Sequence, residues 1–293
     1  SITGNFTVTR GAFNVSSANP SVASLTVGGN TAIANGATMA CVGGGTANVN
    51  TLLTTGGITN NGTLNFRNNQ VVNVTFTGAA DVTFGGTGSG GTTLNLITVN
   101  KGTSQTPTVT LNVGGTVTTT AVAGGWLTIS NGTFDWATAN TTSLSTNAYT
   151  ISPTARLRAS AGTLNTTSGD ADANDLFLNG ALEVAGGTVN VGNTTVNGNN
   201  VDIEYGSAGV PTLTVSAGSL WVKGSVRRSA STISGALAYT QTAGVVTVGG
   251  ISSTDVNTRG VFEIDANTGS SFTLTGTSQL NILRQTNGTG YAD

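Results

Sequence analysis

"LTVSAGSLWV", residues 213–222, is the stretch that decides the fold, because close copies of it recur along the chain. In every copy a glycine stands five places after the first residue, and an apolar residue stands seven places after it. A phrase that recurs with fixed internal spacing indicates a chain built from structural repeats. The other copies begin at Phe6, Leu127, Leu157, Leu182 and Tyr239.

Each phrase alternates apolar and polar residues on either side of its glycine. Such alternation predicts strands with one face inward and the other outward, so Phe134 and Trp136 should lie in the core. Glycine adopts backbone conformations that other residues reach only with strain, which predicts a bend there. Gly132, Gly162, Gly187, Gly218 and Gly244 should therefore line one edge. The residues two places into each phrase should stack inside: Ile129, Val184 and Val215, with Ala159 and Gln241 as weak points.

The phrases from Leu127 onward recur at nearly regular intervals. A looser series begins at Leu25, Leu53, Val82 and Leu111. Regular recurrence of several short strands is typical of a solenoid, in which each coil buries its apolar residues against the next. The spacing predicts an all-β, right-handed parallel β-helix of roughly ten coils, continuous over residues 1–293 and part of a longer chain. The alternative is a series of antiparallel β-hairpins with glycine in each turn.

The composition narrows the possible functions. Only 8% of residues are charged, 43 are glycine, there is no histidine, and the net charge is −2. A weakly charged chain lacks the basic footprint of a nucleic-acid-binding protein, and the absence of histidine removes the commonest general base and metal ligand. Cys41 has no partner for an internal disulfide, which suits a bacterial extracellular protein stabilised by its core. No stretch is apolar enough for a transmembrane segment.

Longer segments resemble the repetitive β-helical regions of large bacterial surface proteins. "NFTVTRGAFNVS" from Asn5, "SLTVGGNTAIANGATM" from Ser24 and "FEIDANTGSSFTLTGTSQLNIL" from Phe262 carry this resemblance. They are most similar to adhesin-like secreted proteins of Bacteroidota, and more distantly to autotransporter passengers and filamentous haemagglutinins. The resemblance implies export to the cell surface and a role in adhesion, motility or shielding.

The expected function is a structural or adhesive extracellular module, a rigid spacer or contact surface without catalysis or cofactor. Its expected partners are other cell-surface proteins, surface polysaccharide or further copies of itself. The alternative is a carbohydrate-active β-helix enzyme, which needs three or more charged side chains from neighbouring coils in one groove. The sequence offers dispersed carboxylate pairs instead. Asp202 with Glu204, and Glu263 with Asp265, alternate with apolar residues and are expected on a solvated face.

An oxygen-rich loop, "SGDADAND", predicts a weak calcium site. Alternate oxygens converge on hard cations, as at the start of a calcium loop. The loop departs from the EF-hand pattern, because Asp175 stands at its sixth position and Ala181 at its twelfth. The alternative is a polar loop at a coil corner. A calcium- or carbohydrate-binding adhesion tip is a third candidate function of the chain. The candidate ligands are Asp170, Asp172, Asn174 and Asp175.

A tryptophan near cationic residues is the last candidate site. Trp221 occupies a position that is usually polar, close to Lys223, Arg227 and Arg228. An exposed tryptophan there could stack on a sugar ring or a partner, or else cover an adjacent loop. Threonine-rich segments such as residues 116–121 do not recur in consecutive coils, so a flat threonine array of the ice-binding kind is not expected.

Overall fold

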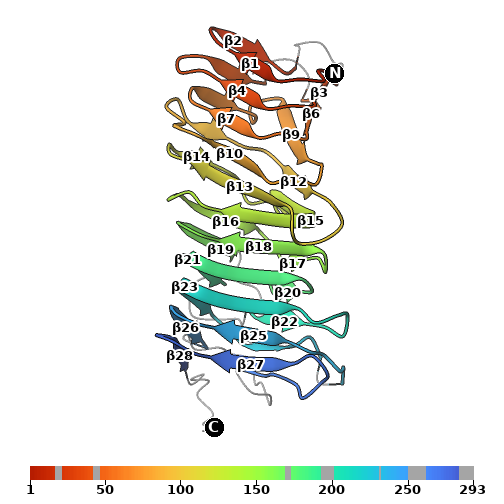
Figure 1. The fold of residues 1–293 in the computed structure, drawn as a ribbon, viewed down its shortest axis with the longest axis vertical. Helices are drawn as coiled ribbons and strands as arrows, with labels where there is room; N and C mark the ends of the chain where they lie inside the picture. The colour runs from red at the N-terminus through yellow and green to blue at the C-terminus, as the bar shows by residue number, and fades with distance from the viewer. Residues whose placement is uncertain are drawn as a thin grey trace. The chain divides into compact units, whose positions relative to one another are not determined.

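The computed structural model describes residues 1–16, 22–41, 47–168, 173–192, 201–230, 232–249 and 262–283. The chain divides into two compact units. Unit 1 comprises residues 1–120 and 126–140, and unit 2 comprises residues 121–125 and 141–293. Among the described residues all regular structure is β, and the pairings between strands are parallel, with an isolated antiparallel bridge between Arg67 and Val71. The expected all-β parallel solenoid is therefore confirmed, and the hairpin alternative is wrong (Figure 1).

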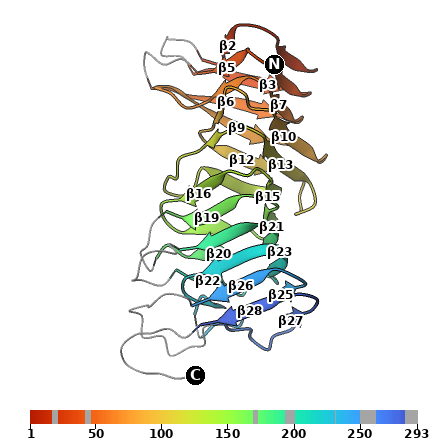
Figure 2. The same ribbon diagram turned by 90° about the vertical axis from the view of Figure 1, so that its left-hand side faces the viewer.

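Unit 1 has three faces of stacked strands, seen from the side in Figure 2. The β3 face contains β3 (Ser24–Val27), β6 (Val49–Thr54), β9 (Val71–Phe76), β12 (Ile97–Asn100) and the first half of β15 (Leu127–Trp136). The β1 face contains β1 (Phe6–Val8), β4 (Thr31–Ile33), β7 (Ile58–Asn60), β10 (Val82–Gly86), β13 (Thr108–Val113) and the second half of β15. The β2 face contains β2 (Ala12–Asn14), β5 (Thr38–Ala40), β8 (Thr63–Asn65), β11 (Thr92–Thr93) and β14 (Val117–Thr118).

The core of unit 1 consists of columns of stacked apolar side chains, as the alternation predicted. Phe134 and Trp136 are fully buried, and both rings contact the buried ring of Trp126 at centroid distances of 6.1 Å. They stack on the preceding coil, where Phe134 is in register with Val109 and Trp136 with Leu111. The inward register expected for this phrase is confirmed.

The phrase at Phe6 is out of phase with the others, which corrects the expected equivalence of all copies. The first half of this copy shares a face with the second half of the copy at Leu127, because Phe6 and Trp136 belong to one column. Each coil of unit 1 has three similar strands, so a short apolar pattern does not specify which face it occupies. The successive partners that connect Phe6 to Trp136 are Thr31, Ile58, Phe84 and Leu111.

The looser series of phrases does not mark equivalent positions in successive coils either, because its members lie on two different faces. Leu25 and Leu53 lie in the β3 face, whereas Val82 and Leu111 lie in the β1 face. Leu25 is in register with Leu52, which is fully buried, while Leu53 points outward and is 37% exposed. Because the series changes face between Leu53 and Val82, its spacing does not measure the length of one coil.

In unit 2 the phrases and the coils coincide. Leu157, Leu182, Leu213 and Tyr239 are successive partners and are fully buried. In two copies the expected break at glycine is only a bulge within one long strand. The strands of this long face are β16 (Thr141–Ser145), β18 (Ala155–Ala159), β19 (Thr163–Thr167), β21 (Ala181–Val191), β23 (Thr212–Val222), β25 (Ala238–Gln241), β26 (Val245–Val248), β27 (Ser271–Leu274) and β28 (Gln279–Ile282).

The glycines of unit 2 stack as predicted. A Cβ added to Gly187 would meet the carbonyl oxygen of Gly162, one added to Gly218 would meet that of Gly187, and one added to Gly244 would meet that of Gly218. Successive backbones approach too closely for a side chain at this edge. Gly132, the fifth member of the predicted set, lies in unit 1 with a φ of 96°.

A separate face of unit 2, the β17 face, carries most of the charged residues discussed below. Its four strands are β17 (Tyr149–Ile151), β20 (Leu176–Leu178), β22 (Ile203–Tyr205) and β24 (Val226–Arg228), stacked in that order. A parallel bridge from Val226 to Phe262 extends its register to the segment that precedes β27. The β17 face therefore brings together residues from four coils.

Candidate functional site

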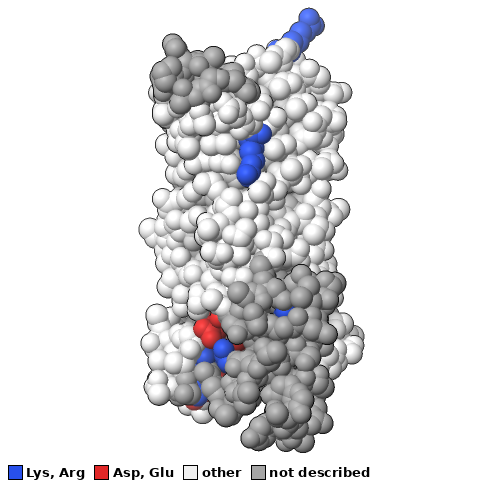
Figure 3. Space-filling view, turned by 180° about the vertical axis from the view of Figure 1, so that it is seen from behind, with Lys and Arg blue, Asp and Glu red and all other residues white. Residues whose placement is uncertain are grey.

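Charged residues are distributed unevenly between the two units. Unit 1 contains five, Arg10, Arg67, Asp81, Lys101 and Asp135, and all others belong to unit 2. In Figure 3, the red atoms and some of the blue atoms lie close together low in the view, whereas other blue atoms stand apart on the white surface above them. The β17 face is therefore the candidate functional site.

Two aspartates occupy equivalent positions on neighbouring coils. Asp175 directly precedes β20, Asp202 directly precedes β22, and Ser225 directly precedes β24. The backbone N–H of Asp202 donates to Asp175 Oδ1 at 2.7 Å, and the N–H of Ser225 donates to Asp202 Oδ1. Each carboxylate therefore accepts a hydrogen bond from the backbone of the next coil, which fixes the stacking of three successive coils at this corner.

Arg227 connects two carboxylates of the preceding coil. Its Nη2 lies 2.6 Å from Asp202 Oδ2, and its Nε lies 3.3 Å from Glu204 Oε1. Asp202 and Glu204 are only 1% and 8% exposed, so the prediction that both are solvated is wrong. Burial of a carboxylate is costly unless it is paired and hydrogen-bonded, and Arg227 supplies that pairing. Strand alternation gave the direction of these side chains but not what surrounds them.

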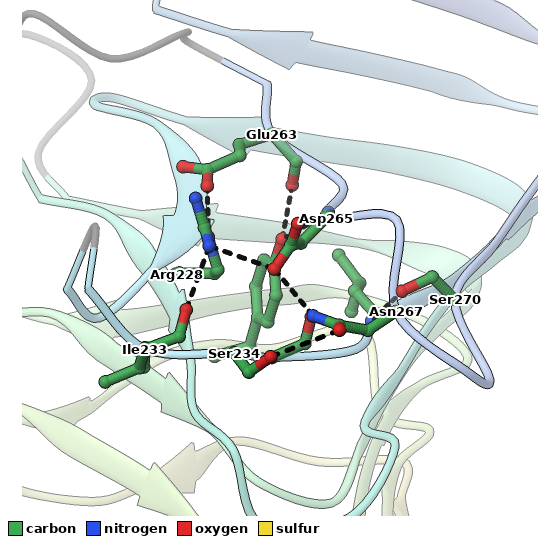
Figure 4. A network of polar contacts seen from close by, with 10 residues as sticks. Arg228, Ile233, Ser234, Glu263, Asp265, Asn267 and Ser270 are labelled. Carbon is green, nitrogen blue, oxygen red and sulfur yellow. Dashed lines mark hydrogen bonds and ion pairs between the residues drawn. The ribbon is translucent and has the colours of Figure 1, made fainter.

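Arg228 forms the second charged network, with the following coil (Figure 4). Its Nε pairs with Glu263 Oε1, and its Nη1 donates to Asp265 Oδ2 and to the Ile233 carbonyl oxygen, both at 2.9 Å. Glu263 and Asp265 are only partly exposed. The interpretation of this carboxylate pair as simple solvated residues is therefore also wrong, because both bind one guanidinium.

Hydrogen bonds around Asp265 extend the same network. Asn267 Nδ2 donates to Asp265 Oδ2 at 2.6 Å and to the Gly235 carbonyl at 3.0 Å, and Ser234 Oγ donates to Asn267 Oδ1 at 3.1 Å. The Tyr205 hydroxyl donates to the Glu263 carbonyl at 2.8 Å. These bonds attach the segment before β27 to β22 and to the chain after β24.

Asp175 has a strongly perturbed electrostatic environment on this face. Burial is the main cause that raises its pKa to about 7, and the charges of Asp202 and Glu204 raise it further. The hydrogen bond from the Asp202 backbone and the charge of Arg227 oppose this shift. A carboxyl group with a pKa near neutrality can act as a general acid or base, but Asp175 is only 7% exposed. Its proton is poorly accessible to a substrate.

The residues predicted to contact a ligand around Trp221 do not form one open site. Trp221 is half-buried and pairs in register with Asn190 and Thr247. Lys223 is 1% exposed, and its aliphatic stem packs where a side chain on Gly192 would lie. Because Arg227 and Arg228 are held by carboxylates, none of the three cations is presented as a free binding group.

The predicted calcium loop is described only in part. Asp170 and Asp172 lie outside the described residues. Asn174 and Asp175 are 8% and 7% exposed, and Asp175 Oδ1 already accepts the Asp202 N–H. Within the described part of the chain, no three Asp, Glu, Cys or His residues are placed to hold a metal ion. Weak calcium binding by the whole loop stays a prediction.

A different pair of arginines lies on the outer surface of the long face of unit 2. Arg156 and Arg158 point outward from β18, and both contact Glu183 on the next coil, at 3.4 and 3.3 Å. These ion pairs are partly exposed and contribute little to stability.

The buried network on the β17 face was missed because its members appear far apart in the sequence. Asp175 and Asp202 are separated by about one coil, and a search for charged residues at that spacing would have found them.

Comparisons with protein-family models, with curated proteins and with solved structures found no match. The chain is thus described by its fold alone, a repetitive parallel β-solenoid protein. The described residues include no helix that is long and apolar enough to cross a membrane.

Proposed function

We propose that this chain is a structural module of a secreted or cell-surface bacterial protein, which acts as a rigid spacer or adhesive contact surface without catalysis. The observation that carries the proposal is the use of the charged residues of the β17 face. Asp202, Glu204, Arg227 and Arg228 form ion pairs between coils rather than an open reactive group. The parallel ladders and buried apolar columns support the same function, because they make each coil depend on its neighbours.

A spacer must stay folded outside the cell, where proteases are abundant. Extended digestion of the purified chain with trypsin and proteinase K, followed by mass spectrometry, tests this function. Most arginines in the described residues lie on strands, so we expect slow cleavage at Arg156, Arg158, Arg227 and Arg228. Rapid cleavage within the β17 face at temperatures well below unfolding would contradict a protease-resistant spacer.

A carbohydrate-active enzyme is the second candidate, favoured by one observation. Asp175, Asp202, Glu204 and Arg227 come from three consecutive coils, and the pKa of Asp175 is raised to about 7. Such a set could supply an acid and a base for glycosidic cleavage. The low exposure of all three carboxylates favours the structural role.

Product analysis separates these two functions. The chain is incubated with neutral and anionic polysaccharides, and new reducing ends are measured for the wild type and for Asp175→Asn. Release of products that depends on Asp175 would establish the enzyme and contradict the structural proposal. We expect no release above the buffer control from either protein.

A further inference from the structure

The outer surface of the β3 face in unit 1 contains no ionisable side chain on any of its strands. One file of outward residues runs through five successive strands in register. Four members of the file are threonines, so single outward threonines recur on this face, although threonine-rich segments such as residues 116–121 do not. The file consists of Thr26, Leu53, Thr75, Thr98 and Thr128.

The parallel ladder fixes the spacing of these groups. Neighbouring strands lie about 4.8 Å apart, so the threonine hydroxyls and methyls repeat at that interval. Side-chain hydrogen bonds between coils hold the adjacent polar groups. Thr51 Oγ donates to Ser24 Oγ at 3.0 Å, and Asn131 Nδ2 donates to Asn100 Oδ1 at 2.9 Å. A surface ordered in this way loses little side-chain freedom when a partner binds.

Apolar groups are mixed with the hydroxyls and amides. Val49 and Leu53 point outward from β6 and are 52% and 37% exposed. The β3 face therefore presents hydrogen-bond donors, acceptors and aliphatic carbon together, without charge. Carbohydrate rings present the same three features, since they carry hydroxyls around C–H surfaces.

We propose that the β3 face of unit 1 binds an uncharged polysaccharide, an inference that rests on the proposed adhesive function and specifies its partner. A charged polymer gains nothing from a surface without counter-charges, because electrostatic attraction and steering need them. A neutral chain can match the hydroxyl and amide groups without leaving a buried charge unpaired.

The test measures retention of the whole chain on insoluble cellulose, chitin, mannan and starch, with alginate beads as the anionic comparison. We expect retention on at least one neutral polysaccharide and not on alginate. Retention should be almost unchanged between low and high salt, since salt screens interactions between charges. The variant Thr75→Lys/Thr98→Lys, which places two lysines on the β3 face, should bind at least tenfold more weakly.

The matched control is Thr59→Lys/Asn112→Lys, which places two lysines at exposed outward positions of the β1 face in the same unit. It should bind like the wild type. Melting temperatures of both variants within a few degrees of the wild type show that any loss is local.

Each other result overturns the inference in a recognisable way. Equal binding by the β3-face variant would mean that another surface is adhesive, and the proposed function would remain. No retention of the wild type on any neutral polysaccharide would exclude this partner, while protease resistance would still test the spacer. If the wild type sediments as a dimer and the Thr75→Lys/Thr98→Lys variant as a monomer, the partner of the β3 face is a second copy of this chain. Enrichment of the protein in slowly grown ice would identify ice as the partner of the β3 face instead.

Discussion

Gln241 illustrates how a single polar residue is accommodated in an apolar column. It is in register with Val215 and is fully buried. Its Oε1 accepts the Tyr239 hydroxyl at 2.6 Å, and its Nε2 donates to the carbonyls of Gly244 and Gln279, both at 3.0 Å. The sequence predicted its inward position and marked it as a weak point of the column. It did not predict that the partners would come from the same coil and the next one.

Replacing Gln241 by alanine should therefore cost more than the lost packing. The Tyr239 hydroxyl would lose its hydrogen bond to Gln241 Oε1. A buried polar group without a partner costs about 1–3 kcal/mol. We expect Gln241→Ala to lower the free energy of unfolding by about that amount in urea titrations. Thr240→Ala, which changes an outward residue of the same strand, should change it by less than about 0.5 kcal/mol. Equal effects of the two variants would refute the role assigned to the buried amide.

Asp175 should make the stability of unit 2 depend on pH. Its pKa is raised from the ordinary 3.8 to about 7, so the folded state keeps the proton in a range where the unfolded chain has released it. Stability from the neutral carboxyl is therefore complete below pH 4 and is lost as the pH rises to about 7. At about 1.4 kcal/mol per pKa unit, the upper limit of this loss is about 4 kcal/mol.

Asp175→Asn tests this pH dependence directly. An asparagine is neutral at every pH and retains an oxygen that can accept the Asp202 N–H. We expect the variant to lose less stability than the wild type between pH 4.5 and pH 8, as measured by urea unfolding at each pH. Parallel pH profiles for the two proteins would show that Asp175 is already ionised in the folded state at low pH.

At the scale of elements, glycine fixes how closely two coils approach. Gly218 has a φ of 74°, and an added Cβ would overlap the carbonyl oxygen of Gly187 on the preceding coil. Gly206 lies on the same unit, has no positive φ, and leaves space for a Cβ, whose nearest atom would be Asn179 Oδ1 at 3.7 Å. A comparison of the two positions therefore distinguishes a glycine that the backbone requires from one that could be replaced.

Gly218→Ala should destabilise unit 2 by about 2 kcal/mol or more, because a left-handed conformation alone costs about 1–2 kcal/mol for alanine and the overlap adds to it. Gly206→Ala should be close to neutral. Thermal unfolding followed by circular dichroism measures both variants. A neutral Gly218→Ala would mean that the coils are not stacked at this edge as described.

The alternation of apolar and polar residues predicted which side chains of a strand point inward. It predicted less well which face of the solenoid each strand occupies. Inward residues such as Phe134 and Leu213 followed from alternation alone. The copy at Phe6 was assigned to the wrong face, and Leu53 was aligned with Leu25 although it points outward. Burial depends on pairing with the neighbouring coils, and no local property of a short strand records which strand it will meet.

At the scale of the whole molecule, the two units use the solenoid differently. Unit 1 contains five charged residues, and the outer surface of its β3 face is uncharged, whereas unit 2 contains buried ion pairs between coils. The composition predicted a weakly charged protein but not this separation. It could not predict the Asp202–Arg227 and Glu263–Arg228 pairs either, because these depend on the coil register. Both the proposed structural role and the proposed polysaccharide-binding surface depend on that register.

A disulfide test between coils measures the register most directly. Thr214 on β23 and Thr240 on β25 are partners in the parallel ladder, and neighbouring strands are about 4.8 Å apart, within reach of a disulfide. We predict that Thr214→Cys/Thr240→Cys forms a disulfide on mild oxidation and keeps the native melting temperature. Thr214→Cys/Thr247→Cys should stay reduced, because Thr247 pairs with Trp221 instead. Failure of the first pair to cross-link, or cross-linking of the second, would contradict the parallel solenoid.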